Sequence, residues 1–339
     1  MGGLFAVIIT RTPFRISFFG GGTDFPAWYH ENGGAVLSTT INKYCYINCR
    51  IQPPFFECKH KIVYSKHETA NEIDEIIHPS VRETLRFMKI TEGVSIHHDG
   101  DLPAMSGLGS SSAFTVGLLH ALYALKGKIV SKKRLAGEAI HIEQEMIKEN
   151  VGSQDQVAVA FGGFNKIEFK SQHNIEVIPI TLGKDAFQRF QDHFLLFFTG
   201  VMRSASRIEA DKLNHINKRK AELETMRSIV DEAFGILSDE RDLLDFGRLL
   251  HENWKLKKSL SEKVSTPYID NIYDTAMKNG SIGGKILGAG GGGFILFFVP
   301  PEYREQVKQA LSFLLHVPFR FDVLGSQIVY YAPEDNYYE

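Results

Sequence analysis

The chain has 339 residues, of which 43% are hydrophobic and 23% are charged, as in folded globular proteins. Its formal net charge of −2 gives no electrostatic reason to expect a nucleic-acid partner or an anionic membrane surface. The three cysteines form a sparse, odd set that favours a reducing compartment. No apolar run approaches the length of a membrane helix, and the apolar stretch 4–9 is too short for a signal peptide. We therefore expect a cytoplasmic protein.

The first half of the chain alternates short apolar runs with glycine-rich breaks. These runs predict strands at Val7–Thr10, Ile16–Phe19, Ala35–Thr40, Tyr44–Ile51 and Val94–His98. Apolar residues at helical spacing predict helices over Phe114–Leu125 and Ser131–Lys148. A β section is expected over Gly162–Ile180.

The second half changes to long amphipathic helices followed by short strands. After a strand at Phe194–Thr199, helical spacing predicts helices over Ser206–Leu237, Leu243–Leu260 and Pro267–Lys278. The remaining predicted elements are a strand at Phe294–Val299, a helix at Glu302–Leu315, and strands at Phe319–Asp322 and Gln327–Tyr331. The length favours two domains, which we place at residues 1–195 and 196–339 of an α+β protein.

A Gly-Leu-Gly-Ser-Ser-Ser run leads into the first predicted helix and is the most informative segment of the chain. Glycines permit a tight backbone with positive φ, and serines cap helices. The first N–H groups of a helix have no partner within it and lie at the positive end of its dipole, which suits a phosphate. An ordinary serine-capped helix is the alternative interpretation. The predicted phosphate-binding residues are Gly107, Leu108, Gly109, Ser110, Ser111 and Ser112.

Two other phosphate-binding motifs do not occur in the sequence. Each Gly-Lys pair is followed by Ile or Asp, whereas a P-loop requires Ser or Thr at that position. A dinucleotide motif, G-x-G-x-x-G, begins at Gly20 and Gly22, but Phe25 stands where its last glycine should be. We therefore expect the phosphates to be held by backbone and hydroxyl groups, without a P-loop lysine.

Two further glycine-rich segments and one acidic segment complete the set of motifs. Arg15 precedes a Gly-Gly-Gly-Thr-Asp run over 20–24, a glycine run over 288–293 precedes a predicted strand, and Asp155 lies in Gly-Ser-Gln-Asp-Gln. Taken singly, each segment has an ordinary structural interpretation. The run over 20–24 also fits a loop after a strand, the run over 288–293 a bulged hairpin, and the Asp155 segment a helix cap. Together they suit an enzyme that brings its backbone close to a phosphorylated ligand from several sides.

At these residues the chain resembles the GHMP kinases, a family that includes galactokinase, homoserine kinase and mevalonate kinase. The three motifs, Pro13 to Asp24, Gly107 to Ser112 and Gly288 to Gly293, occur in the family's order, and the resemblance covers nearly the whole chain. Gly152 to Gln156 resembles the catalytic-aspartate segment of the sugar-kinase branch. The resemblance implies an N-terminal domain similar to domain 2 of ribosomal protein S5, a ferredoxin-like C-terminal domain, and an active site between them.

The resemblance also implies a role for each motif. It places the ATP phosphates on residues 107–112, and Mg²⁺ on the hydroxyl of Ser111 and the carboxylate of Glu143. Asp155 would position the sugar hydroxyl or accept its proton, and Arg15 would lie beside Asp155 and offset charge on the transferred phosphate. The sugar would be held by Thr23, Asp24, Gly22, Arg203, Gly290 and Gly291.

Within the family, the chain is most similar to the kinases of D-glycero-D-manno-heptose 7-phosphate. This similarity implies transfer from ATP to the anomeric hydroxyl of a phosphorylated seven-carbon sugar, on the route to GDP-heptose for surface polysaccharide. Galactokinases have an acidic residue and a histidine where this chain has Gly21 and Gly22, which counts against galactose and fits a larger sugar. Lys43, Arg203 and Arg207 are candidates for contact with a distal phosphate.

Two alternatives stay open at this point. One is a kinase of free fucose or another free sugar, and the other is a non-catalytic sensor of sugar and ATP on the same fold. The joint presence of Asp155, Arg15 and Glu143 favours the enzyme. We also expect a homodimer.

Overall fold

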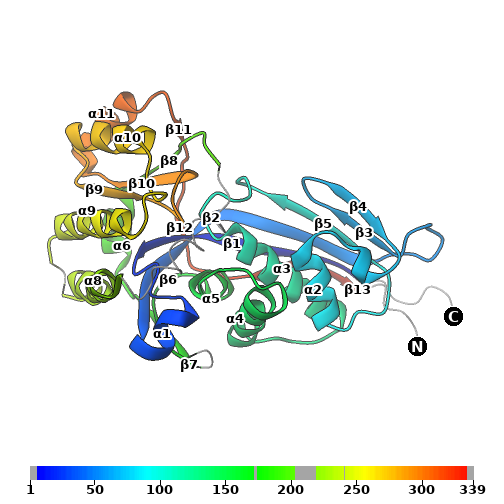
Figure 1. Cartoon of the computed structure of the whole chain (residues 1–339). Coiled ribbons are helices and arrows are strands. Elements are labelled where there is room, and N and C mark those ends of the chain that lie inside the picture. Colours follow the sequence, from blue (N-terminus) through cyan, green and yellow to red (C-terminus); the bar gives the residue numbers. More distant parts are fainter. Residues whose placement is uncertain (1–5, 172–173, 203–218, 240, 334–339) are drawn as a thin grey trace.

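A computed structural model of the chain describes residues 6–171, 174–202, 219–239 and 241–333. The described strands form a nine-stranded sheet and a four-stranded sheet, with helices packed against both (Figure 1). No helix in this part of the chain is long and apolar enough to cross a membrane. The mixture of helices and sheets agrees with the predicted α+β class.

The larger sheet has the strand order β13-β1-β2-β5-β3-β4, with β6 and β12 also pairing with β2, and β7 with β6. All these pairs are antiparallel except β3 with β5. Its strands are β1 (Ala6–Phe19), β2 (Gly34–Ile51), β3 (His60–Val63), β4 (His67–Ala70), β5 (Val94–Gly100), β6 (Phe164–Ser171), β7 (Asn174–Pro179), β12 (Phe321–Asp322) and β13 (Gln327–Pro333).

The two longest strands each combine two predicted ones. The runs at Val7–Thr10 and Ile16–Phe19 belong to β1, although Pro13 lies between them. The pairing of β1 with β2 shifts register between Pro13 and Phe14, and such an irregularity accommodates a residue without an N–H donor. Tyr44–Ile51 likewise continues the same strand as Ala35–Thr40.

Helix α3 (Ser110–Leu125) is the central helix on the larger sheet and packs on β1 and β2. Its residues are buried on nearly every side, which explains why it is apolar all round rather than along one stripe. The predicted helix over Ser131–Lys148 ends earlier, at His141, and continues as a single π-helical turn. The other helical segments of this half are α1 (Pro26–Asn32), η1 (Ile73–Glu75), α2 (Pro79–Phe87), α4 (Lys132–His141), η2 (Ile142–Met146), α5 (Gln154–Phe161) and α6 (Lys184–Asp192).

The smaller sheet has the order β11-β8-β10-β9, and helix α9 packs on β9. The predicted helix over Ser206–Leu237 begins outside the described residues, and the last predicted helix is shorter than expected. The elements of this half are β8 (Phe194–Phe198), α8 (Lys220–Ser238), α9 (Leu243–Leu260), α10 (Pro267–Lys278), β9 (Gly283–Ile286), β10 (Phe294–Phe298), η4 (Pro301–Tyr303), α11 (Arg304–Ala310) and β11 (Leu315–His316).

The chain returns to the larger sheet at its end, where β12 pairs with β2 and β13 with β1. The strands after residue 320 therefore belong to the sheet formed mainly by the first half. The predicted division at residue 195 falls inside β8, which lies in the smaller sheet. The boundary between residues 195 and 196 stays a prediction.

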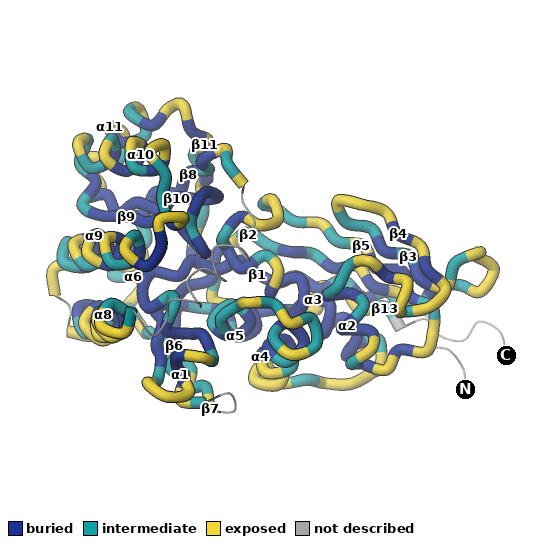
Figure 2. The backbone as a smooth tube through the Cα atoms, viewed as in Figure 1, coloured by how far each residue is buried: buried dark blue, intermediate teal, exposed yellow. Residues whose placement is uncertain are grey.

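An aromatic cluster joins the two sheets. The ring of Phe18 on β1 lies 5.5 Å from Phe246 on α9, and Phe190 on α6 lies 4.8 Å from Phe246. Phe194 on β8 packs on Phe18 at 5.1 Å and on Phe298 of β10 at 5.3 Å. Both sheets are dark blue, hence buried, where they meet in Figure 2. Dense aromatic packing of this kind fixes the position of the glycine run at 288–293 relative to β1.

Candidate active site

The predicted phosphate loop ends at the N-terminus of α3. Gly109 is the residue before the helix, and its φ of 75° lies in the left-handed region that favours glycine. The three serines that follow form the first helical turn, instead of capping it as expected, and no side chain caps this end. The N–H groups of that turn have no partner within the helix, so this end of α3 suits an anion.

A bidentate ion pair lies beside this loop. Arg15 on β1 donates from Nε to Oδ1 of Asp155 at 2.7 Å, and from Nη2 to Oδ2 at 2.8 Å. Its remaining nitrogen, Nη1, donates to the carbonyl oxygen of Gly107 at 2.7 Å. Asp155 lies in the first turn of α5 and is more accessible than Arg15, since 26% of its side chain is exposed compared with 4%. Arg15 therefore fixes the carboxylate and the phosphate loop relative to each other.

The third glycine segment touches the phosphate loop directly. A Cβ atom on Gly288 would lie 2.5 Å from Cα of Gly107, and one on Gly107 would lie 2.5 Å from the carbonyl oxygen of Leu287. Real Cβ atoms do not approach other atoms so closely, so only glycine fits on either side of this contact. Two segments far apart in sequence are glycine-rich for the same local reason.

Asp24 connects the first motif to the segment that carries Asp155. Its Oδ1 accepts a hydrogen bond from the N–H of Gly22 at 2.8 Å, and its backbone oxygen accepts one from Ser153 at 2.8 Å. Ser153 immediately precedes α5. The loop after β1 and the start of α5 therefore hold each other in place.

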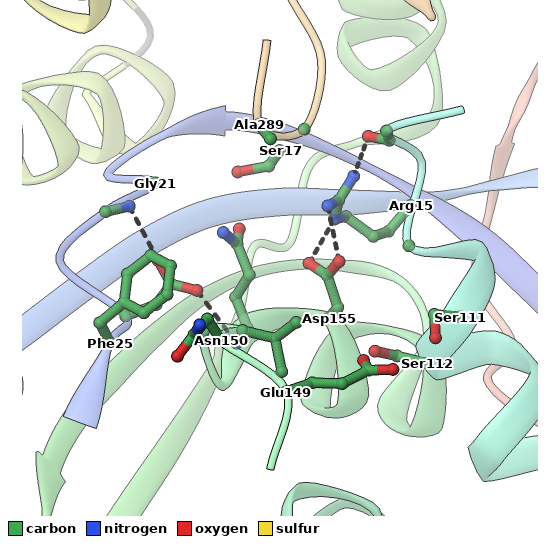
Figure 3. A pocket seen from close by; sticks show the side chains of 18 of the residues that line it. Arg15, Ser17, Gly21, Phe25, Ser111, Ser112, Glu149, Asn150, Asp155 and Ala289 are labelled. Atoms are coloured by element: carbon green, nitrogen blue, oxygen red, sulfur yellow. Dashed lines mark hydrogen bonds and ion pairs between the residues drawn. The ribbon is translucent and has the colours of Figure 1, made fainter. Parts of the chain in front are cut away.

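These elements surround a cavity of about 550 Å³ (Figure 3). The carboxylate of Asp155, clamped by Arg15, and the start of α3 both lie at its wall. Its other described lining residues are Ser17, Gly21, Gly22, Asp24, Phe25, Met105, Gly107, Gly109, Ser110, Ser111, Ser112, Lys148, Glu149, Asn150, Val151, Gly152, Gln154, Lys257, Lys285, Gly288 and Ala289. A cavity of this size holds a small organic substrate together with a phosphate group.

Comparisons with known proteins agree with this geometry. The GHMP kinases N terminal domain matches residues 75–163, and the GHMP kinases C terminal domain matches residues 232–316. The chain is 33% identical to the D-glycero-alpha-D-manno-heptose 7-phosphate kinase of Campylobacter jejuni, over 90% of this chain and 93% of that protein. The chain belongs to the GHMP kinase family.

Solved structures show the same fold for this GHMP kinase. A D-glycero-D-manno-heptose 1-phosphate kinase from Bacteroides thetaiotaomicron superposes with a TM-score of 0.77, at 24% identity over 95% of this chain and 98% of that one. A galactokinase from Lactococcus lactis in complex with galactose gives 0.72, at 20% identity over 95% of each chain. These two structures show the two-part GHMP kinase fold that the resemblance implied. The family models and the relative from Campylobacter jejuni show a phosphotransferase that uses ATP.

The structure brings most of the predicted site residues of this GHMP kinase to the cavity, but not all of them. Thr23 is fully buried, and its hydroxyl donates to the carbonyl groups of Gly20 and Ala35, so it stabilises the loop. Leu108 is also fully buried, and its carbonyl oxygen accepts from the N–H of Arg15. Neither of these side chains lines the cavity.

The third motif reaches the cavity through different residues from those expected. Gly288 and Ala289 line it, whereas Gly290 and Gly291 pack against the backbone of Val264. The predicted contacts of Gly290 and Gly291 with the sugar therefore have no support in the cavity lining. Arg203 and Arg207 lie outside the described residues.

Glu143 lies behind the phosphate loop and is 1% exposed. Its Oε2 accepts hydrogen bonds from the hydroxyl of Ser112 at 2.9 Å and from the side-chain amide of Gln156. Its Oε1 has no hydrogen-bond partner among the described residues. Burial raises the pKa of Glu143 to about 7. A buried carboxylate oxygen without a partner fits a cation, although Glu143 contacts Ser112 rather than Ser111 and is not in the cavity lining.

Several polar residues at the cavity wall are not among the predicted site residues. Lys148 has a φ of 63°, a backbone conformation that is uncommon outside glycine, and it lies two residues after the π-helical turn. Burial raises the pKa of Glu149, the next residue. Lys257 on α9 and Lys285 on β9 are buried at the wall and donate to backbone carbonyl groups. Lys257 and Lys285 are single charges in a helix and a strand, and Lys148 and Glu149 lie in a loop, so no local pattern predicts a place for them at the cavity.

Proposed function

We propose that this GHMP kinase transfers the γ-phosphate of ATP to the anomeric hydroxyl of D-glycero-D-manno-heptose 7-phosphate and forms the 1,7-bisphosphate. The observation that carries the reaction type is the carboxylate of Asp155, clamped by Arg15 and facing the cavity beside the start of α3. The heptose kinase from Campylobacter jejuni, which matches over nearly its whole length, supports the choice of substrate.

Asp155 positions the hydroxyl that attacks the γ-phosphate. Because the transition state of phosphoryl transfer is loose, the attacking oxygen loses its proton late, and the step does not require a strong base. The two hydrogen bonds from Arg15 prevent the carboxylate from rotating away from the hydroxyl. The guanidinium also places positive charge beside the group in flight, which stabilises the charge that develops there.

The start of α3 binds the nucleotide phosphates through the unpaired N–H groups of its first turn. A magnesium ion brought with ATP would supply positive charge beside the phosphate groups. Ser111, which lines the cavity, and Glu143, with its unpartnered Oε1, are the residues that would hold this ion.

A substrate with a distal phosphate requires cations in the cavity besides Arg15. Lys148, Lys257 and Lys285 are such cations in the described lining, and they come from a loop, from α9 and from β9. This distribution supports a substrate that carries more than one charged group. The homodimer and the cytoplasmic location stay predictions.

Measuring ADP release with a panel of sugars tests the proposal. The panel contains heptose 7-phosphate, the unphosphorylated heptose, fucose, galactose and mannose. We expect kcat/KM for heptose 7-phosphate to exceed that for the free heptose by at least about 10²-fold, since charge-assisted hydrogen bonds contribute about 1.5–3 kcal/mol each. Equal efficiency on the two heptoses would overturn the phosphosugar assignment, and a preference for fucose would replace it with a free-sugar kinase.

A further inference from the structure

Two side chains at the cavity wall have oxygen atoms without hydrogen-bond partners. Ser17 is 6% exposed, and its Oγ has no partner among the described residues. Oε1 of Gln154 is also buried and has no partner in this part of the chain. Both residues line the cavity, and although they lie within the motifs Pro13 to Asp24 and Gly152 to Gln156, neither is among the predicted site residues. Buried polar atoms are usually paired. Other described residues, such as Ser38, also have an unpartnered buried oxygen, but those of Ser17 and Gln154 belong to residues of the cavity lining, where a ligand can supply the partner.

Both residues are adjacent to the catalytic pair. Ser17 follows Arg15 by two positions on β1, where pairing with β2 is regular, so both side chains are on the same face of the sheet. Successive residues on one face are about 6.6 Å apart, which is a spacing within the size of a sugar ring. Gln154 directly precedes Asp155 at the start of α5. A sugar whose reacting hydroxyl meets Asp155 therefore extends toward Ser17 and Gln154.

Gly21 lies where these two side chains converge. A Cβ atom on Gly21 would lie 3.6 Å from Nε2 of Gln154 and 4.0 Å from Oγ of Ser17, which are ordinary contact distances. Unlike Gly20 and Gly22, Gly21 does not have a positive φ. Neither its backbone nor its neighbours require a glycine. The missing side chain instead leaves space between the two polar groups.

We propose that Ser17, Gln154 and Gly21 form a subsite that binds one non-reacting hydroxyl group of the sugar and thereby determines specificity. A hydroxyl both donates and accepts hydrogen bonds, as do the serine hydroxyl and the glutamine amide, so each orphaned oxygen receives a partner. The three residues carry no charge, which distinguishes this subsite from the lysines at the wall. The inference rests on the proposed sugar kinase function and adds the residues that recognise the sugar beside the reacting carbon.

Analogues of heptose 7-phosphate that lack one hydroxyl group, at C2, C3, C4 or C6, test the subsite. Replacement of Ser17 by Ala or of Gln154 by Leu should lower kcat/KM on the complete substrate by about tenfold or more, because a polar group is left unpaired in a closed site. On the analogue that lacks the hydroxyl group bound by this subsite, the wild-type enzyme should lose a similar factor in kcat/KM. The two substitutions should lower kcat/KM on that analogue almost no further. A purely structural role would lower the rate on every analogue alike.

Ser38→Ala is the matched control. Ser38 pairs directly with Ser17 in the sheet, is equally buried, and also has an Oγ without a partner among the described residues. It does not line the cavity. We expect Ser38→Ala to have wild-type kcat/KM on the complete substrate and on every analogue.

Gly21→Ala tests the space itself. The backbone accepts the new methyl group, which fills the gap between Ser17 and Gln154, so we expect a folded enzyme with a KM for the sugar raised about tenfold and an unchanged KM for ATP. Unchanged sugar kinetics in Gly21→Ala, or the same penalty for Ser17→Ala on all analogues, would overturn the subsite. If the wild-type enzyme uses a free sugar and not heptose 7-phosphate, the proposed substrate fails, and deoxy analogues of that sugar then test the subsite.

Discussion

Arg15 and Asp155 are 140 residues apart in sequence and are joined by two parallel hydrogen bonds of 2.7 and 2.8 Å. Such a fork requires the planar guanidinium, because an ammonium group cannot donate to both carboxylate oxygens in one plane. Since Arg15 also donates to Gly107, one side chain holds the catalytic carboxylate and the phosphate loop in register. This relationship leads to the first two predictions.

Asp155→Asn should leave ATP affinity nearly intact and lower kcat by about 10² or more. The amide keeps the size of the side chain but does not take up a proton, and its single oxygen replaces two charged acceptors of the Arg15 guanidinium. Rapid-quench kinetics with the sugar, together with calorimetry with ATP, separates the two effects. Turnover near the wild-type rate would remove Asp155 from the mechanism.

Arg15→Lys should keep the positive charge but lose the fork, with kcat reduced by about tenfold or more. A lysine that pairs with Asp155 has no second nitrogen for the carbonyl oxygen of Gly107. Because the phosphate loop then loses this hydrogen bond, KM for ATP should also rise. Titration with ATP and with the sugar in the steady state measures both. An enzyme with unchanged kcat would show that charge alone, and not orientation, is the contribution of Arg15.

Gly109→Ala should abolish or greatly weaken nucleotide binding. The new Cβ would lie 3.1 Å from Cγ of Arg15, at a φ of 75° that side chains rarely adopt. Gly137→Ala is the control, because Gly137 lies inside α4 with no atom within 4 Å of a new Cβ. We expect that control to bind ATP normally and to gain about 1 kcal/mol of stability. Calorimetry that finds full ATP affinity in folded Gly109→Ala would contradict the phosphate site.

His120 should make the fold sensitive to acid. Its Nδ1 lies 3.0 Å from Oγ of Ser326, and burial lowers its pKa below the ordinary 6.5. Below about pH 6.5 the unfolded chain binds a proton that the folded chain does not, so stability falls as the pH falls until the folded pKa is reached. His120→Gln removes this contribution. Its free energy of unfolding relative to wild type should therefore rise as the pH falls from about 7.5 to about 5.5.

Urea unfolding of both proteins at these two pH values measures the difference. Other buried histidines with lowered pKa, such as His78 and His98, remain in both proteins, so their contributions cancel. A stability difference that does not change with pH would show that His120 is not responsible.

The local chemistry of the motifs could be predicted from the sequence, and their contacts could not. The glycines and serines before α3 indicate a phosphate loop because the required φ values and free N–H groups are properties of that segment alone. The contact of Gly107 with Gly288, and the convergence of Ser17 and Gln154 on Gly21, depend on which strands become neighbours. Thr23 was expected to help bind the sugar, but its hydroxyl donates to the carbonyl oxygen of Ala35. This bond forms because β2, which carries Ala35, passes close to the loop.

The observed helix and strand boundaries differ from the predicted ones for similar reasons. Pro13 looks like a strand breaker, yet the register shift opposite it lets β1 continue to Phe19. Helix α5 was not predicted, since its first turn carries the polar residues of the catalytic segment and its apolar part is short. In each case the tertiary neighbours decided what the local pattern left open.

The most direct test of the account is the position of the new phosphate on the sugar. ³¹P NMR of a reaction with wild-type enzyme, ATP and heptose 7-phosphate should show a second phosphorus resonance coupled to the anomeric proton, with one ADP formed for each phosphate transferred. Asp155→Asn should form this product far more slowly. A new resonance coupled to a proton on another carbon, or consumption of ATP without a sugar bisphosphate, would contradict the account.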